Sequence, residues 1–325
     1  MAARKTAEIV TAEIVTADAG LLDPGIRGRR MRRLSGLAWA SLSVLIFSGW
    51  FVVTRFSVTR DLSAWDVAML RFGIGAVLLS PVLLAGRNRL PGRAWREGLL
   101  FMLLWGAPFV LLIAFGLQRT SAARAAAIAP TLMPVWAGIL GAVLLRQRQG
   151  MIRWGGYAAI LAGLCWLIVA GPNGAALDPA GLMALVAAAA LWAIYTLLFR
   201  RSTLTPLQSA ALICFWSAAL LLPIYLLFGL SRLSLAAPGE IAIQVVYQGV
   251  LMGGVSIVAF NRAIAALGPA AASAVIALVP AMAAVLAYPV LGETPTWSDA
   301  LATAVIVAGV LLASRSSSTA QRGAA

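Results

Sequence analysis

PVWAGILGAVLLRQ at residues 134–147 and PAMAAVLAYPVLGE at residues 280–293 are two matching stretches, one in each half of the chain. Each begins with a proline inside a long apolar run and ends with a polar residue. The same offset of 146 residues separates Pro134 from Pro280 (280 − 134), Gln147 from Glu293 (293 − 147) and Gly163 from Gly309 (309 − 163). This constant offset predicts that one membrane unit occurs twice. Repeated membrane bundles usually place a substrate site where the repeats meet.

The composition is typical of a polytopic membrane protein, with 62% hydrophobic residues, 11% charged residues and a mean hydropathy of +0.93. The net charge of +14 would also suit a nucleic-acid-binding protein, but the basic residues are scattered through short connections and form no stripe. We therefore expect no nucleic-acid partner. Cys165 and Cys214 both lie in apolar runs, which predicts no disulfide framework.

Ten apolar windows are each long enough to cross the hydrocarbon core of a bilayer, about 30 Å thick, which takes about 20 helical residues. Runs this continuous are helices, because unpaired backbone cannot face lipid. Five spans per half make the two repeats enter the membrane in opposite senses. We therefore expect an all-α polytopic fold of two inverted five-helix repeats, at 34–171 and 172–314. The windows lie at approximately 34–56, 65–85, 98–118, 124–145, 154–171, 180–199, 207–229, 241–262, 270–291 and 297–314.

Arginine placement predicts the orientation, because positive charge collects on cytoplasmic connections. One alternating set of connections and both tails are rich in arginine, whereas the other set is poorer and contains Asp61, Asp178 and Asp299. We therefore expect both termini in the cytoplasm. Residues 1–33 are expected to form a disordered cytoplasmic tail, unless the true start is Met31, and residues 315–325 a second cytoplasmic tail.

The chain resembles the drug/metabolite transporter superfamily, in its ten-helix branch of two EamA-type repeats. The resemblance lies in Ser48-Gly49-Trp50-Phe51-Val52-Val53, in Leu70-Arg71-Phe72 and in the two proline stretches quoted above. One departure is Gln147, because the family usually has an acidic residue after the fourth span. The resemblance, which is strongest to amino-acid exporters, implies a bacterial inner-membrane protein that moves small metabolites, often outward.

Absent residue types narrow the chemistry. The sequence contains no histidine, which removes Ser-His catalysis, histidine metal sites and histidine proton relays. We expect no enzymatic activity, no cofactor and no metal site. Every acidic residue lies in a tail, in a loop or near a predicted helix end, as Asp66 and Glu240 do. Proton-coupled transporters generally need a titratable group at depth, so we expect facilitated transport without proton coupling.

Arg71 is the basic residue expected deepest in the hydrocarbon, about two turns into the second span. An intramembrane arginine is costly unless it faces a cavity or a partner. One interpretation makes Arg71 the counter-charge for a substrate carboxylate. The other makes it a snorkelling residue near the outer surface, or one paired with Asp66.

Aromatic and amide side chains near the middle of the spans complete a candidate substrate pocket. Ordinary helix packing is the alternative interpretation for each of them. The candidates besides Arg71 are Phe47, Trp50, Trp105, Trp192, Tyr195, Tyr247 and Gln248.

Pro134 and Pro280 are candidate kinks and hinges. A proline inside a helix leaves the carbonyl four residues earlier without its usual donor, here the carbonyls of Pro130 and Ile276. A substrate ammonium or a water-filled cavity would supply a new partner. Kinks also serve helix packing alone, and the sequence leaves both interpretations open.

The substrate class follows from the charges that the pocket lacks. Sugar phosphates call for several buried basic residues, and lipophilic cations favour a buried carboxylate. We expect neutral or zwitterionic solutes, chiefly aromatic and other neutral amino acids, exported by alternating access. The expected partners are this substrate and the lipid bilayer, with the protein a monomer or homodimer. Another small metabolite or drug, moved in either direction, and a non-transporting membrane scaffold remain alternatives.

Overall fold

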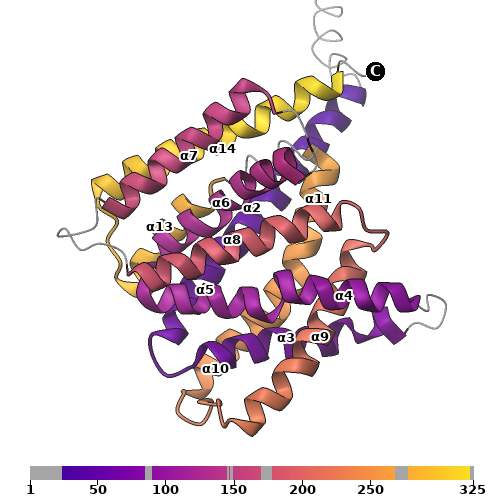
Figure 1. The fold of residues 1–325 in the computed structure, drawn as a ribbon, viewed down its shortest axis with the longest axis vertical. Coiled ribbons are helices and arrows are strands. Elements are labelled where there is room, and N and C mark those ends of the chain that lie inside the picture. The colour runs from indigo at the N-terminus through magenta and orange to yellow at the C-terminus, as the bar shows by residue number, and fades with distance from the viewer. Residues whose placement is uncertain are drawn as a thin grey trace, which may run out of the picture.

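The computed structural model describes residues 24–84, 90–144, 146, 149–169, 178–267 and 277–322. Every regular element in these ranges is a helix (Figure 1), which confirms the all-α class for this part of the chain. The helices are α2 (Pro24–Val58), α3 (Ala64–Leu84), α4 (Gly92–Trp105), α5 (Ala107–Arg119), α6 (Ala122–Leu144), α7 (Met151–Val169), α8 (Pro179–Phe199), α9 (Pro206–Leu227), α10 (Pro238–Gln244), the π-helical segment η3 (Val245–Val255), α11 (Ser256–Leu267), α13 (Val279–Leu291) and α14 (Trp297–Arg322).

Eight of the described segments are long and apolar enough to cross a membrane, including α4 and α5 taken together. The expected span at 241–262 consists of α10, η3 and α11 in succession. For the expected span at 270–291, α13 covers the second part, and residues 270–276 lie outside the described ranges. Helix α2 begins at Pro24 and α14 ends at Arg322, so residues 24–33 and 315–322, expected in the tails, are helical.

Short polar motifs determine where two of the spans begin. At the start of α3, the Ser63 backbone N–H donates to Asp66 Oδ2 (2.8 Å) and the Asp66 N–H donates to Ser63 Oγ (3.1 Å). Thr296 and Asp299 form the same reciprocal pair at the start of α14, at 3.1 Å in each direction. Such capping boxes satisfy N–H groups that have no partner within the helix. Two of the four unpaired N–H groups at the start of each of these helices are therefore bonded.

The third span of each half is irregular at a matching position. Gly106 separates α4 from α5, with φ −98° and ψ −133°, and the Ala107 N–H donates to Ser217 Oγ of α9 (3.2 Å). A Cβ on Gly106 would lie 2.5 Å from the Met102 carbonyl oxygen and from Ser217 Oγ, so a larger residue does not fit. Adding the offset of 146 to 106 gives Met252, which lies within η3. Irregular backbone therefore recurs at corresponding places in the two halves.

The first helix of each half packs on helices of the other half. Helix α2 of the first half packs on α11 and α13, and its counterpart α8 packs on α5 and α6. Helices α3 and α9, which correspond to each other, pack together, as do α7 and α14. This pattern is the one expected when two copies of one unit are related by an approximate two-fold axis.

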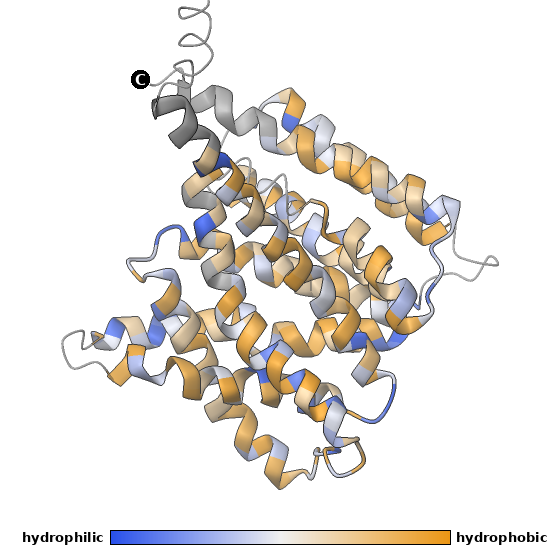
Figure 2. Cartoon of the chain, turned by 180° about the vertical axis from the view of Figure 1, so that it is seen from behind, coloured by the Kyte–Doolittle hydropathy of each residue, from blue (hydrophilic) through white to orange (hydrophobic). Residues whose placement is uncertain are grey.

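Helices α7 and α14 form a closely packed pair along one side of the bundle (Figure 1). A Cβ on Gly156 would lie 2.7 Å from the Gly309 carbonyl oxygen, and one on Gly163 would lie 2.7 Å from Ile306 Cγ1. These glycines therefore allow close packing inside the molecule. Figure 2 shows that the helices are mainly hydrophobic along their length, with hydrophilic residues gathered at connections and helix ends, and many large hydrophobic side chains on the helices are exposed. A bundle surrounded by lipid requires this distribution.

Candidate functional site

Trp50 is held in the interior of the bundle by hydrogen bonds between α2 and η3. Its indole Nε1 donates to Gln248 Oε1 (2.9 Å), and Gln248 Nε2 donates to Thr54 Oγ1 (3.0 Å). All three side chains are buried. Thr54 lies one helical turn after Trp50 on the same face of α2. Because both ends of the Gln248 amide are bonded, the orientation of the Trp50 ring is fixed.

Arg71 of α3 lies beside Trp50 with its charge unmatched. The Arg71 side chain is only 9% exposed, its Cζ lies 5.0 Å from the centre of the Trp50 ring, and its Nη1 has no hydrogen-bond partner. The alternative partner Asp66 is bonded elsewhere, because it accepts from Ser63, from the Tyr225 hydroxyl and from the Arg232 backbone N–H. Among the described residues, the ion pairs do not include Arg71. A buried cation without a hydrogen-bonded counter-charge is costly.

Phe109 of α5 joins Trp50 to a second group of aromatic rings. Its ring stacks on Trp50 at 6.3 Å between centroids and contacts Trp192 edge-on at 5.9 Å. Trp105 stacks on Trp192 and on Tyr195 at 6.2 and 4.8 Å. Phe109 therefore links five of the predicted side chains, from both halves of the chain, either directly or through one intervening ring. Those five are Trp50, Arg71 and Trp105 of the first half, and Trp192 and Tyr195 of the second half, with Gln248 bonded to Trp50 as a sixth.

Two predicted pocket residues lie apart from this group. The Tyr247 hydroxyl donates to the Ile46 carbonyl oxygen (3.2 Å) and occupies the space that a Cβ on Gly49 would need. Phe47 contacts Phe260 of α11 edge-on, at 6.4 Å between centroids. Both contacts join α2 to the helices that pack on it, which is the packing interpretation of these residues.

The two prolines of the repeat occupy different places in their helices. Pro134 lies inside α6, together with Pro130. Pro280 lies in the first turn of α13, where a missing N–H interrupts no hydrogen bond of the described helix. Gln147 and Ile276 lie outside the described residues. The hinge role of either proline stays a prediction.

Sequence reasoning missed several buried polar groups beside the site. Gln244 lies one turn before Gln248 and donates through Nε2 to the Val53 carbonyl oxygen and to Ser57 Oγ, at 2.8 Å each. Gln244 Oε1 and Glu240 Oε1 are buried without hydrogen-bond partners. The spacing of four residues between Glu240, Gln244 and Gln248 places them on one helical face. In the sequence, this spacing of four residues between polar side chains was the signal for a polar helix face that packs against α2.

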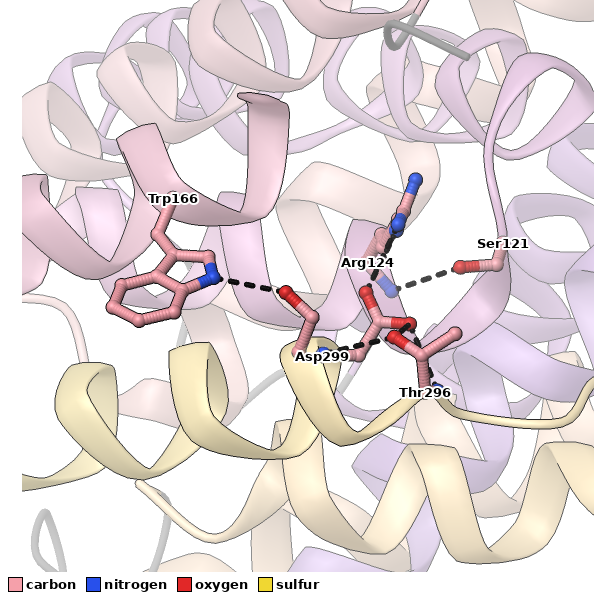
Figure 3. Close-up of polar contacts among 6 residues, drawn as sticks. Ser121, Arg124, Trp166, Thr296 and Asp299 are labelled. Carbon is pink, nitrogen blue, oxygen red and sulfur yellow. Dashed lines mark hydrogen bonds and ion pairs between the residues drawn. The ribbon is translucent and has the colours of Figure 1, made fainter. Parts of the chain in front are cut away.

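A second polar cluster links α6, α7 and α14 (Figure 3). Arg124 Nε and Nη2 donate to Asp299 Oδ1 at 3.1 and 3.0 Å, and Thr296 Oγ1 donates to Asp299 Oδ2 at 2.8 Å. Nearby, Trp166 Nε1 donates to Ser298 Oγ (2.9 Å). The cluster thus ties the start of α6 to the start of α14. Among the described residues, no three His, Cys, Asp or Glu side chains gather as a metal site would require.

Two similar halves of apolar helices surround a buried cluster of aromatic rings, one amide and one unmatched arginine, which is the architecture of a multi-pass membrane transporter. The chain belongs to the EamA-like transporter family, whose repeat matches residues 34–169 and again residues 179–315. These two ranges agree with the duplication read from the offset of 146 residues.

Two known proteins resemble the chain over more than half of its length. It is 29% identical over 195 residues to a probable terminal-alkyne amino-acid exporter of Streptantibioticus cattleyicolor, and the alignment covers 59% of this chain and 64% of that relative. A protein crystal structure matches with a TM-score of 0.61 at 24% identity, covering 86% of this chain and 96% of the other. The structural likeness concerns the fold.

Proposed function

We propose that this protein exports small zwitterionic metabolites, chiefly aromatic and other neutral amino acids, by alternating access across a bacterial inner membrane. The observation that carries this proposal is the buried Arg71 guanidinium, which lies against Trp50 and has no carboxylate partner among the described residues. A substrate carboxylate would supply the missing anion as a charge-assisted hydrogen bond. The rings of Trp50, Phe109 and Trp105 would accommodate an apolar or aromatic side chain.

The proposed orientation has ten spans, inverted repeats and both termini in the cytoplasm. The exchanged packing of the two halves supports it, as does the position of the first turns of α2 and the last turns of α14 at one end of the molecule (Figure 1). In this orientation the end of α2 and the start of α6 face the outside. Transport is proposed to run without proton coupling, because the buried carboxylates of Asp66 and Glu240 lie in the first turns of their helices.

The similarity to a probable terminal-alkyne amino-acid exporter supports amino acids as the substrate class. It also agrees with the charges at the site, where a cation is available for a carboxylate. A small uncharged solute would leave Arg71 unmatched, which is costly inside a bundle. The site therefore favours a substrate with a carboxylate.

Replacing Arg71 tests this assignment. In proteoliposomes, Arg71→Gln is expected to slow phenylalanine exchange about 10- to 100-fold, because a hydrogen bond to a charged group contributes about 1.5–3 kcal/mol. Arg71→Lys keeps the charge and should retain part of the activity. The exposed Arg119 provides a matched control, since Arg119→Gln should exchange at the wild-type rate.

Phenethylamine, which has the same ring but no carboxylate, separates the carboxylate role from a packing role. Wild-type protein is expected to exchange phenylalanine in strong preference to phenethylamine, and Arg71→Gln should lose this preference. Wild-type exchange by a folded Arg71→Gln variant, with the preference intact, would retire the counter-charge role.

A further inference from the structure

One ion pair joins four helix ends at the face proposed to be external. Arg55, in the last turn of α2, forms an ion pair with Glu293, which follows α13, and its Nη1 donates to the Leu117 carbonyl oxygen in the last turn of α5. Glu293 Oε2 accepts from the backbone N–H of Ala122, the first residue of α6 (3.0 Å). The guanidinium thus lies at two helix C-termini and the carboxylate at a helix N-terminus. Both charges match the helix dipoles.

The backbone after α13 is shaped to present Glu293 to this position. Gly292 has φ +68°, in the left-handed region that favours glycine, and its N–H donates to the Tyr288 carbonyl oxygen (3.0 Å). Helix α13 therefore ends at Leu291, and the backbone changes direction at Gly292. This turn carries the Glu293 carboxylate to the start of α6 in the other half of the molecule.

The Arg55–Glu293 pair is more enclosed than a surface ion pair at the same face. Its side chains are 22% and 19% exposed, whereas those of Arg119 and Asp178 are 34% and 46% exposed. Exposed pairs contribute little, because water and salt screen them. Arg55 also lies five residues after Trp50 (55 − 50), about 7.5 Å along α2. The pair therefore lies beyond the candidate site along α2, which carries Trp50, and Arg55 also contacts the end of α5, which carries Phe109.

The repeat gives this ion pair no counterpart of the same charges in the sequence of the first half. The offset of 146 matches Arg55 with Arg201 (201 − 55) and Glu293 with Gln147 (293 − 147). In an inverted repeat, matching positions lie at opposite faces of the membrane. Glutamine carries no charge, so the counterpart of Glu293 offers no carboxylate to an arginine.

We propose that Arg55 and Glu293 are gating residues, whose ion pair closes the external passage to the site and must open for the substrate to leave. This inference rests on the proposed function for its orientation. Closure joins the ends of α2, α5, α6 and α13, and opening separates the guanidinium from the carboxylate. Because Gln147 is neutral, the chain favours the state closed to the outside. The substitution Glu293→Gln gives the second half the same residue that the first half has at position 147, and it removes this preference.

Cysteine labelling tests the gate without any substrate. The variants carry Thr54→Cys as the reporter in a chain with Cys165→Ala and Cys214→Ala, since Thr54 lies between Trp50 and the ion pair. A charged, membrane-impermeant methanethiosulfonate reagent is applied to right-side-out vesicles or to inverted vesicles. Glu293→Gln and Arg55→Gln should make labelling from outside about tenfold faster, as expected for the loss of one bond between charged groups. Labelling from the cytoplasmic side should become slower.

Two controls separate gating from general loosening. Arg55→Lys keeps the charge and should label nearly as slowly as the reporter protein alone, and Arg119→Gln, which breaks the exposed ion pair, should have no effect. Unchanged labelling in Glu293→Gln would overturn the gate, and so would faster labelling from both sides. The labelling result is independent of transport, so absence of amino-acid exchange with the labelling pattern intact would retire the substrate proposal alone.

Discussion

Buried polar side chains in this bundle fall into two kinds. Gln248 has both ends of its amide bonded, to Trp50 and to Thr54, and it therefore fixes neighbouring residues in place. Arg71 instead has an unbonded nitrogen and no carboxylate partner in the part of the chain that the structure describes. A bonded group stabilises the structure, whereas an unmatched buried charge is retained at a cost. This difference supports the proposal that Gln248 is a positioning residue and that Arg71 contacts the substrate.

Gln248→Leu is expected to destabilise the protein and to weaken substrate binding. Leucine leaves the Trp50 N–H buried without an acceptor, which costs about 1–3 kcal/mol of unfolding free energy. The Trp50 ring would also lose its fixed orientation, so KM for amino-acid exchange should rise more than kcat falls. Thermal unfolding in detergent and exchange kinetics measure these effects. An unchanged KM together with a lowered unfolding midpoint would make Gln248 a structural residue only.

Sequence reasoning located the site residues that are polar or unusual within an apolar run. Arg71, Trp50 and Gln248 were visible in this way, and the structure places both Arg71 and Gln248 in contact with Trp50. Phe109 was missed, because a phenylalanine in an apolar helix gives no signal of its own. The pairing of Arg71 with Asp66 was open in the sequence, and it is absent because Asp66 caps α3 and binds Tyr225.

At the scale of helices, small residues determine how closely the fifth and tenth spans approach. Gly163 faces Ile306 and the Ala302 carbonyl oxygen of α14, at 2.7 and 3.0 Å from the place of a Cβ. Gly155 of the same helix has nothing within 4 Å of that place. These two glycines therefore differ in role, although the sequence presents them in the same way.

Gly163→Leu is expected to separate α7 from α14. The added side chain would meet backbone atoms of α14, which cannot move independently of the helix, and overpacking of this kind costs about 1–3 kcal/mol. The midpoint of thermal unfolding in detergent should fall accordingly. Gly155→Leu is the matched control and should leave the midpoint unchanged. Equal midpoints for the two variants would show that the close approach of these helices contributes nothing to stability.

The sequence predicted the helices better than it predicted their irregularities. Continuous apolar runs indicated spans, but the break at Gly106 depends on Ser217, which accepts from the freed Ala107 N–H and lies 110 residues away (217 − 107). The π-helical segment η3 has no distinct pattern in the apolar run. Pro280 appeared equivalent to Pro134, yet it starts a helix whereas Pro134 lies inside one. The break at Gly106 is therefore decided by a tertiary contact, which the sequence of the span does not show.

At the scale of the whole molecule, the duplication accounts for most of the architecture. The offset of 146 residues, read from the prolines, the glycines and the polar ends of the motif, predicted two equivalent units. The family match to residues 34–169 and 179–315 confirms them, and the helices exchange partners between the halves. The halves differ in charge, because Glu293 forms an ion pair and its counterpart is Gln147. Two halves of similar fold that differ in charge at positions 147 and 293 suit a carrier that favours opening to one side of the membrane.

Counterflow in proteoliposomes tests the proposed amino-acid transport most directly. Vesicles loaded with an unlabelled aromatic amino acid receive a trace of the labelled compound outside, with equal pH on both sides. The purified protein is expected to accumulate the label transiently above its equilibrium level, and Arg71→Gln should not. No accumulation with any amino acid by folded protein, or accumulation that requires an imposed pH gradient, would contradict uncoupled amino-acid transport.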